Sequence, residues 1–399
     1  MSLTCEKLME FNLLEEREKQ INTDMDTELL IKMFNLFNEI GKIDNFIKDS
    51  PSFPGSTEKI MRSELTSVIG ATLSIEGTIL EREEIEESLK KADQGEVLKR
   101  KEQEAENSRN VYNFIVDFVN NNKQDFKYSE QLIKQIHNYF TEKMNYVANV
   151  PGKYRGDFNV SFGNPRKESL CRTQSEIEAA MKAFIIWLNS ISVGVLSSNI
   201  FIKAMMAHYY LAEIHPFGDG NGRTARALEA LILYAHGVNN YCFWSWANFW
   251  SSHKDQYLLK LHNIRITLDP TEFIMWGLEG YRDEINGIKT KVLKKVKQLM
   301  FSDYIHYLLR NKKDGTRKVN LKMVNVLQLL IKTGRISLKK FYTSPEMIAL
   351  YANVSTSTRG RHFQKMVSQD LIKIGKSNSD SEDFIEPNFE ILEYVRYNV

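Results

Sequence analysis

Apolar residues recur every three or four positions along most of this 399-residue chain, and this spacing constrains its fold more than any other feature. Residues 28–47 and 58–76 carry apolar side chains on one helical face, and Gly77 stops the second run. Further helices are predicted over residues 83–89, 107–121, 129–145, 175–189, 198–214, 223–236, 251–262 and 271–309, the last in one or two pieces. The sequence therefore predicts an all-α fold.

Strand patterns are few and short. Residues 153–162 alternate apolar and polar side chains, which predicts a small exposed hairpin. A polar stretch at 311–318 interrupts the helical pattern. Beyond it we expect helices over 321–333, 345–351 and 358–369, then two strands, 372–374 and 384–385, around a polar loop at 375–383. That order is typical of a winged helix-turn-helix domain.

Composition excludes several classes of protein. The chain has 53 basic and 51 acidic residues, and 42% of its residues are hydrophobic, so neither wholesale disorder nor a uniformly basic nucleic-acid coat protein fits. Cys5, Cys171 and Cys242 form no CxxC pair, which favours reduced thiols in a cytoplasmic protein over a disulfide framework or a zinc cluster. Residues 1–14 lack the apolar core of a signal peptide, and no uncharged apolar run is long enough to predict a membrane span.

The most informative stretch is residues 215–226, HPFGDGNGRTAR. Pro216 disfavours helical geometry at His215, so the preceding helix must stop there. Three glycines then permit a tight loop whose amides point into a common space, and the next helix begins at Arg223 with its N-terminus facing that space. This arrangement predicts an anion-binding site.

The side chains of the stretch add reactive groups to the anion site. His215 titrates near neutral pH and can take a proton from a hydroxyl group, while Asp219 offers hard oxygen ligands to Mg²⁺. Arg223 and Arg226 lie three residues apart and can reach one phosphate group. Together these groups indicate phosphoryl or nucleotidyl transfer. The structural alternative is a glycine-rich turn with a surface histidine and two helix arginines; GxxxxGK(S/T) is absent, which excludes a P-loop.

Residues 215–226 also resemble the signature HPFx(D/E)GNGRxxR of the Fic family at every defined position. The resemblance implies a mainly α-helical fold and transfer of AMP from ATP to a protein hydroxyl group. It assigns His215 as general base and Asp219 as the Mg²⁺ ligand. It implies that Arg223 contacts the β- and γ-phosphates and Arg226 the γ-phosphate. The loop residues that would hold the phosphates are Gly218, Gly220, Asn221 and Gly222.

Two further segments resemble parts of Fic proteins. Residues 151–163 are similar to the family's flap, a hairpin that holds the backbone of the target by strand addition. The family's valine would fall on Asn159, whereas this chain has Val160, and an ordinary surface hairpin is the alternative. The candidate flap residues are Phe158, Asn159, Val160, Ser161, Phe162 and Gly163. Near the later helices, Tyr257 is a candidate for the adenine pocket, with core packing equally favoured.

Thr72 to Gly77, TLSIEG, resembles the family's inhibitory motif (S/T)xxxE(G/N). Glu76 falls in the last turn of a predicted helix, where a negative charge opposes the helix dipole and calls for a cationic partner. The resemblance implies that Glu76 binds Arg226 and occupies the γ-phosphate position. The alternative is an exposed glutamate before a glycine that ends the helix.

In the last domain, Arg359, Arg361 and Lys365 are candidate DNA contacts on the third helix. From residue 318 onward 12 basic residues stand against 8 acidic ones, a mild excess, and DNA binding and protein binding are equally favoured. We expect four regions: an N-terminal helical region at 1–100 with the inhibitory helix near 58–77, a catalytic domain at 101–285, a helical linker at 286–317, and the winged-helix domain at 318–399.

The predicted function is Mg²⁺-dependent transfer of AMP from ATP to a hydroxyl side chain of a target protein, held low by Glu76. Alternatives are removal of AMP or transfer of another phosphate-containing group at the same site, and a DNA-binding regulator that senses nucleotide. The expected partners are an unknown target protein, the protein itself as a target, and DNA. A second copy of the chain is also expected, partly because aromatic residues gather at 243–250.

Overall fold

The computed structural model divides the chain into two compact units, Met1–Lys289 and Thr290–Val399. It describes residues 3–19, 24–50, 56–123, 126–145, 149–191, 196, 199–239, 246–313, 316–317, 319–376 and 383–395. Helices dominate both units and the strands form only small antiparallel sheets in the described residues, so the predicted mainly α-helical class is confirmed. The limits of the four expected regions stay predictions, because the contacts separate two units and place residues 1–100 and 101–285 in one of them.

The helices from α1 to α13 match most of the predicted runs, and α13 continues past Lys289 into the second unit. The structure has a single α13 where the sequence left one or two pieces open, and α7 ends four residues before its predicted end. The short α11 was not predicted. The bounds are α1 Cys5–Leu8, α2 Leu13–Lys19, α3 Asp24–Asp49, α4 Ser56–Ile75, α5 Arg82–Asp93, α6 Arg100–Asn121, α7 Glu130–Thr141, α8 Gln174–Asn189, α9 Ile200–Ile214, α10 Asn221–Ala235, α11 Ala247–Ser252, α12 Lys254–Thr267 and α13 Thr271–Arg310.

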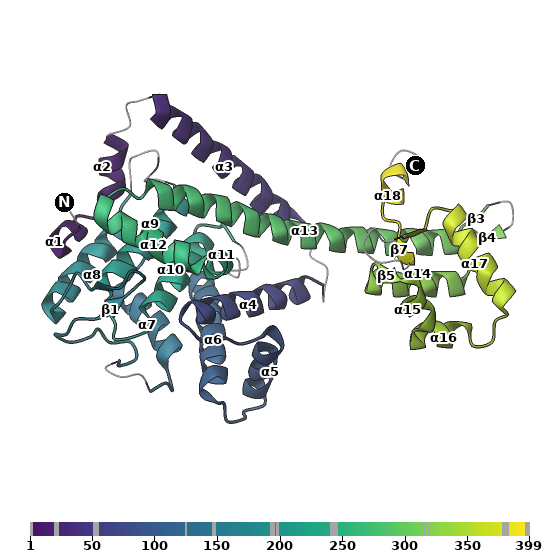
Figure 1. Cartoon of the computed structure of the whole chain (residues 1–399), viewed down its shortest axis with the longest axis horizontal. Helices are drawn as coiled ribbons and strands as arrows, with labels where there is room; N and C mark the ends of the chain where they lie inside the picture. Colours follow the sequence, from purple (N-terminus) through teal and green to yellow (C-terminus); the bar gives the residue numbers. More distant parts are fainter. Residues whose placement is uncertain are drawn as a thin grey trace. The chain divides into compact units, whose positions relative to one another are not determined.

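Helices α9 and α10 form the centre of the first unit (Figure 1). Nearly every residue of α9 is buried, including its polar His208, which explains why this helix shows little amphipathic pattern. Helices α6 and α7 pack against α10, and α4 packs against α5, α6, α10 and α11. This packing brings the end of α4 to the beginning of α10, although about 150 residues separate them in sequence.

The predicted hairpin over residues 153–162 was wrong in position. The strands are β1 Ser161–Phe162 and β2 Lys167–Glu168, paired antiparallel. Residues 153–160 form turns and irregular backbone instead. The amide of Arg155 donates to the carbonyl of Pro216 at 2.9 Å, so the backbone at Arg155 is bound to the loop between α9 and α10.

Two expectations about side chains are clarified by the packing. Trp246 and Trp250 are fully buried, so these members of the aromatic cluster belong to the core of the unit, while residues 243–244 lie outside the described part of the chain.

Cys5 and Cys171 are brought together, with their Sγ atoms 2.8 Å apart. A hydrogen bond from Cys171 lowers the pKa of Cys5, whereas the same contact and burial raise the pKa of Cys171. Cys242 lies outside the described residues.

The second unit has its own hydrophobic core, which includes Leu327, Leu330, Phe341 and Met366. Its sheet has the strand order β5-β7-β6, with both pairs antiparallel. The predicted loop at 375–383 falls mostly on residues outside the described ranges. The elements are β3 Lys312–Lys313, β4 Thr316–Arg317, α14 Leu321–Thr333, β5 Ile336–Ser337, α15 Leu338–Thr343, α16 Pro345–Tyr351, α17 Thr356–Ser368, β6 Ile372–Lys376, β7 Asp383–Pro387 and α18 Ile391–Val395.

None of the helices within the described ranges combines the length and the apolar character needed to cross a membrane.

Leu327→Ala is expected to destabilise the second unit by about 2–5 kcal/mol, because Leu327 is fully buried in its core and truncation leaves a cavity. Leu321→Ala on the same helix is the matched control, since Leu321 is 61% exposed. Denaturant unfolding followed by circular dichroism measures both changes. Equal effects of the two substitutions would contradict the assigned core.

Candidate active site

The turn between α9 and α10 is built from two left-handed residues. His215 ends α9 with φ 52° and ψ 56°, and Gly220 precedes α10 with φ 76°. A left-handed conformation is uncommon for a residue with a side chain, and such strain is often found at functional sites. Asn221 closes the turn, because its side chain accepts from the amide of Phe217 and donates to the carbonyl of Phe217, both at 2.9 Å.

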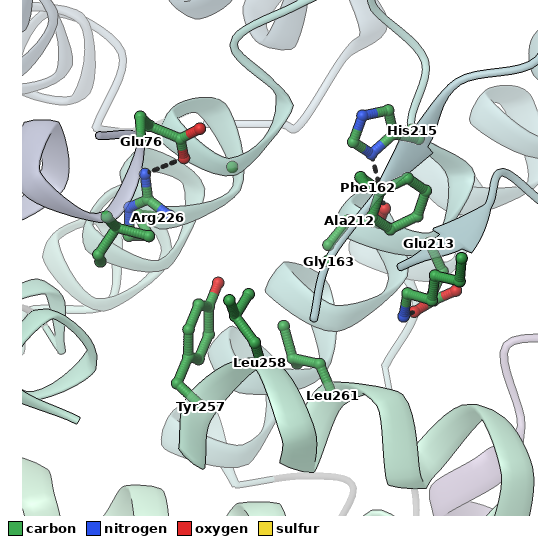
Figure 2. A pocket seen from close by; sticks show the side chains of 13 residues that line it. Glu76, Phe162, Gly163, Ala212, Glu213, His215, Arg226, Tyr257, Leu258 and Leu261 are labelled. Carbon is green, nitrogen blue, oxygen red and sulfur yellow. Dashed lines mark hydrogen bonds and ion pairs between the residues drawn. The ribbon is translucent and has the colours of Figure 1, made fainter. Parts of the chain in front are cut away.

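The imidazole of His215 has a defined tautomer. Its Nδ1 lies 3.1 Å from the carbonyl oxygen of Ala212, which can only accept, so Nδ1 carries the proton and Nε2 keeps a lone pair (Figure 2). Burial lowers the pKa of His215 to about 4, and the ring stacks on Phe162 of β1 at 3.9 Å between centroids. His215 is therefore neutral at physiological pH and can accept a proton at Nε2.

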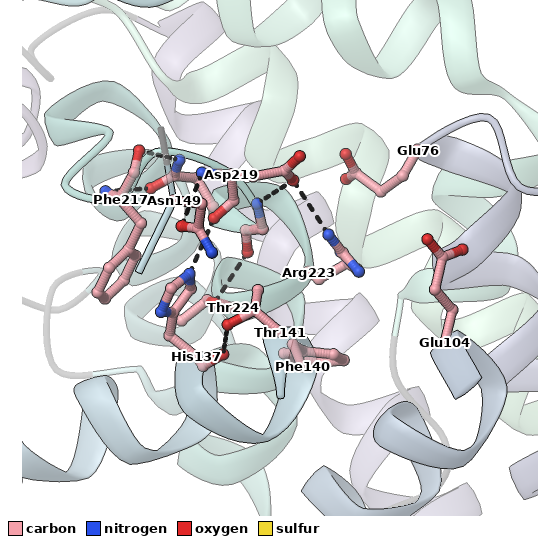
Figure 3. A network of polar contacts seen from close by, with 12 residues as sticks. Glu76, Glu104, His137, Phe140, Thr141, Asn149, Phe217, Asp219, Arg223 and Thr224 are labelled. Carbon is pink, nitrogen blue, oxygen red and sulfur yellow. Dashed lines mark hydrogen bonds and ion pairs between the residues drawn. The ribbon is translucent and has the colours of Figure 1, made fainter. Parts of the chain in front are cut away.

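A second neutral histidine supports the turn from below. His137 of α7 accepts from the amide of Gly152 at Nδ1 and donates from Nε2 to the carbonyl of Asp219 (Figure 3). Its ring lies flat on Phe217 with centroids 3.7 Å apart, and burial lowers its pKa to about 4. Asn149 adds a hydrogen bond to the amide of Asp219 at 3.1 Å. His137 is thus a structural group that holds the turn through its two ring nitrogens.

Arg155 is a site residue to which the sequence assigned no role. Its side chain is buried, and Nε donates to the carbonyl of His215 at 2.9 Å. Its other nitrogens donate to the carbonyls of Phe158 and Cys171. Arg155 therefore connects the start of the flap segment to the backbone of the candidate base. The only signal in the sequence was its place in residues 151–155, PGKYR, at the start of the flap segment.

Arg226 of α10 meets the end of α4. Its Nε donates to Oγ1 of Thr72 at 2.8 Å, and its Nη2 donates to the carbonyl of Thr72 at 3.2 Å and to Oε1 of Glu76 at 2.6 Å. The structure thus brings Thr72 and Glu76 to Arg226, the contact that the family resemblance implied. Glu76 lies just beyond the last residue of α4 rather than inside it, and Gly77 follows with φ 93°.

The carboxylate of Glu76 occupies the anion site at the start of α10. A Cβ atom added to Gly222 would overlap Oε1 of Glu76, so the carboxylate sits directly over this glycine. Burial would raise the pKa of Glu76, but Arg226 and Arg223 outweigh it and hold that pKa below its usual value. An ionised carboxylate therefore fills a place where the helix N-terminus and two guanidiniums favour negative charge.

Asp219 is the acidic group of the loop. Its Oδ1 accepts from the amide of Gly220 and from Nη2 of Arg223, the latter at 3.0 Å, and its side chain is 40% exposed. Among the described residues no group of three or more metal-ligating side chains exists. A single exposed carboxylate beside an anion site fits Mg²⁺ that enters with phosphate oxygens as its other ligands, and does not fit an all-protein metal cage.

His215, Gly222, Arg226 and Glu76 line one cavity of about 210 Å³, whereas Asp219 and Arg223 are not among its lining residues. In Figure 2 the Glu76–Arg226 pair lies on one side, His215 and Phe162 on the other, and α12 supplies Tyr257, Leu258 and Leu261. Lys167 also lines the cavity, where its Nζ donates to the buried carboxylate of Glu213, and burial lowers its pKa. Neither Lys167 nor Glu213 was predicted, because nothing in their local sequence pairs them.

The predicted residues divide into those that meet at the cavity and those that do not. The flap residues Phe162 and Gly163 line it, whereas Phe158 is 36% exposed and its carbonyl binds Arg155. Tyr257 lines it with a nearly buried side chain. The candidate DNA contacts lie in the other unit, on α17: Arg359, Arg361 and Lys365.

Comparison with known proteins points to one family. Residues 127–233 match the model of the Fic/DOC family. The chain is 47% identical over 62 residues to the protein adenylyltransferase Fic of Nematostella vectensis, and 46% identical over 57 residues to the protein adenylyltransferase fic-1 of Caenorhabditis elegans. These matches cover 16% and 14% of this chain, and 14% and 11% of the two relatives.

Solved structures show the same fold over longer stretches. A Fic family protein from Desulfovibrio desulfuricans superposes with a TM-score of 0.53 at 17% identity, covering 89% of this chain and 95% of that one. Fic-1 from C. elegans superposes with a TM-score of 0.50 at 21% identity, covering 68% and 76%. At these identities the likeness concerns the fold alone.

The two site histidines are expected to be neutral with opposite tautomers. In ¹⁵N NMR spectra His215 should be protonated at Nδ1 and His137 at Nε2, and both should titrate near pH 4 because burial lowers their pKa values. Single His→Gln variants assign the signals. A His215 signal that titrates near 6.5, the usual value, would contradict the buried environment.

Proposed function

The chain belongs to the Fic/DOC family through the domain at residues 127–233, and on this premise we propose that it transfers AMP from ATP to a hydroxyl side chain of a target protein. The observation that carries the proposal is the pairing of a neutral His215 with an arginine-lined anion site in one cavity. A base for a hydroxyl group and a binding place for phosphates are the two requirements of this reaction.

The chemistry follows from the positions of these groups. Nε2 of His215 takes the proton of the target's hydroxyl group, and the hydroxyl oxygen attacks the α-phosphorus of ATP. The bond between that phosphorus and the bridging oxygen to the β-phosphate breaks, and pyrophosphate leaves. Arg223, Arg226 and the amides at the start of α10 bind the β- and γ-phosphates and neutralise the charge that builds up on them.

Asp219 is the residue of the loop that would hold Mg²⁺, together with phosphate oxygens. The ion would supply additional neutralisation of the phosphates when bound. Because Oδ1 of Asp219 already accepts from Arg223, the same carboxylate also fixes the position of that guanidinium.

The Glu76–Arg226 contact supports an inhibited ground state. Glu76 lies over Gly222 and binds the arginine that the proposal assigns to the γ-phosphate, so ATP and the Glu76 carboxylate compete for one place. Its partner Arg226 is only 1% exposed, so solvent screens the contact little on that side. Release of Glu76 would open the site, and the protein itself or another protein would then present the hydroxyl group along the flap.

Other reactions at this site use the same residues. Removal of AMP from a protein, or transfer of a different phosphate-containing group, also needs His215 and the anion site. Thermal shifts with ATP, GTP, UTP and CDP-choline rank the donors, and the proposal requires that ATP stabilise the Glu76→Gly variant most.

Glu76→Gly is expected to raise labelling from ATP carrying a labelled α-phosphate by about 10- to 100-fold, since one charge-assisted hydrogen bond is worth roughly 1.5–3 kcal/mol. His215→Ala in the same background should lower it by at least about 100-fold. Mass spectrometry of the protein and of a cell lysate detects the AMP adduct on itself or on a target.

Glu58→Gln is the matched control, because Glu58 is an exposed glutamate at the other end of α4. If Glu76→Gly does not raise the labelling, Glu76 is not inhibitory. If His215→Ala labels as strongly as the parent variant, His215 is not the general base.

DNA binding by the second unit is a second candidate function. Its helices and its strand order β5-β7-β6 fit a winged helix-turn-helix, with α17 as the recognition helix. Arg361 and Lys365 are exposed on α17, and the ring of Tyr342 packs against Arg359 at 5.4 Å. The observation that favours DNA binding is that these basic side chains lie on one helix, which has the place of the recognition helix in a winged helix-turn-helix fold.

Arg361→Ala with Lys365→Ala in the full chain is expected to weaken binding to duplex DNA and to lower its salt dependence by about one unit of log–log slope per lost phosphate contact. Gel shifts at two salt concentrations measure this. Lys42→Ala on α3, an exposed lysine of the first unit, is the control. If the chain does not bind duplex DNA, or if the double substitution does not weaken that binding, the second unit has no DNA-binding role.

A further inference from the structure

A row of buried polar side chains leads from the core of the first unit to the cavity. Glu229 and His208 are fully buried, and Tyr257 and Arg226 are 3% and 1% exposed. Burial of so many polar groups is costly unless each finds a partner. The proposed chemistry uses only Arg226 of these four, so the other three need a separate explanation.

The row has a consistent direction of hydrogen bonding. Tyr257 and Arg226 line the same cavity, and because a guanidinium can only donate, the phenol oxygen is the acceptor in their interaction. The single proton of Tyr257 is then available to Nε2 of His208 at 2.7 Å. His208 in turn donates from Nδ1 to Oε1 of Glu229 at 2.6 Å.

The far end of the row is itself held. Trp250 of α11 donates from Nε1 to the same Oε1 of Glu229 at 3.2 Å, and its ring lies against Tyr257 at 5.3 Å. The members come from α9, α10, α11 and α12. None of them belongs to α4, which carries Thr72 and Glu76.

Arg226 therefore has two independent supports. On one side Thr72 and Glu76 hold it through α4, and on the other Tyr257 holds it through the buried row. Departure of Glu76 would remove part of the first support and leave the second intact. A buried guanidinium that kept no such partner would turn or take in water just when a phosphate has to bind.

We propose that Tyr257, His208 and Glu229 are positioning residues that hold Arg226 ready for the terminal phosphate of a nucleoside triphosphate after Glu76 has left. The inference rests on the proposed function, because that function assigns Arg226 to the γ-phosphate. It gives the hydroxyl group of Tyr257 a role that does not require contact with adenine.

The test compares ATP with AMP, which lacks the terminal phosphates. Titration calorimetry on Glu76→Gly is repeated after adding Tyr257→Phe, His208→Gln or Glu229→Gln. The dissociation constant for ATP should rise about tenfold in each case, the effect of one lost hydrogen bond to a charged group, while that for AMP stays the same.

Tyr209→Phe is the matched control. Tyr209 is a fully buried tyrosine next to His208, and its hydroxyl group has no hydrogen-bond partner among the described residues. It should change neither constant. Adding Tyr257→Phe to a variant that already carries Arg226→Ala should have no further effect on ATP, because the row acts through Arg226.

Two results would overturn the inference: equal weakening of ATP and AMP, which indicates general damage to the fold, or additive effects of Tyr257→Phe and Arg226→Ala. Failure of the proposed function is a different outcome. A Glu76→Gly protein that binds ATP but labels no protein would refute AMP transfer, and the ATP-to-AMP comparison would still decide the role of the row.

Discussion

Arg226 places a full positive charge where its side chain is only 1% exposed, and residues from distant parts of the first unit satisfy it. A buried guanidinium needs partners for its donors, and here they come from the end of α4 and from α12. The need for these partners explains why an N-terminal helix is joined to α10 across 150 residues of sequence. Under the proposed function the same contact would serve regulation, since any anion that replaces Glu76 must offer comparable charge.

At the other end of the cavity, burial keeps His215 uncharged, in contrast to the charged Arg226. Burial lowers the pKa of His215, so this group is kept neutral, whereas the guanidinium of Arg226 keeps its proton when buried, and Glu76 raises its pKa further. One cavity thus holds a base that can accept a proton and a cation that can hold phosphate. The hydrogen bonds of Arg155 and Asn221 hold the left-handed turn between α9 and α10 in place.

The sequence predicted regular elements well where burial follows a single period. The helices α14 and α16 have their predicted bounds, because apolar spacing and capping residues agree there. The hairpin was misplaced, because the alternation over 153–162 reflects a segment bound to a loop by Arg155 and not a strand pair. Nothing local in the sequence distinguishes these two cases, since the partner atoms lie some 60 residues away.

The sequence by itself determined the mainly helical class, the motif at 215–226 and the residue types needed for transfer of a phosphate-containing group, because helical period and short-range spacing are local properties. Only the tertiary structure decided that Cys5 meets Cys171 and that Tyr257, His208 and Glu229 form one buried row. The family resemblance already implied the contact between Glu76 and Arg226, and the structure gives its geometry. These residues lie far apart in the sequence and are brought together by packing in three dimensions. Local sequence patterns do not indicate such contacts.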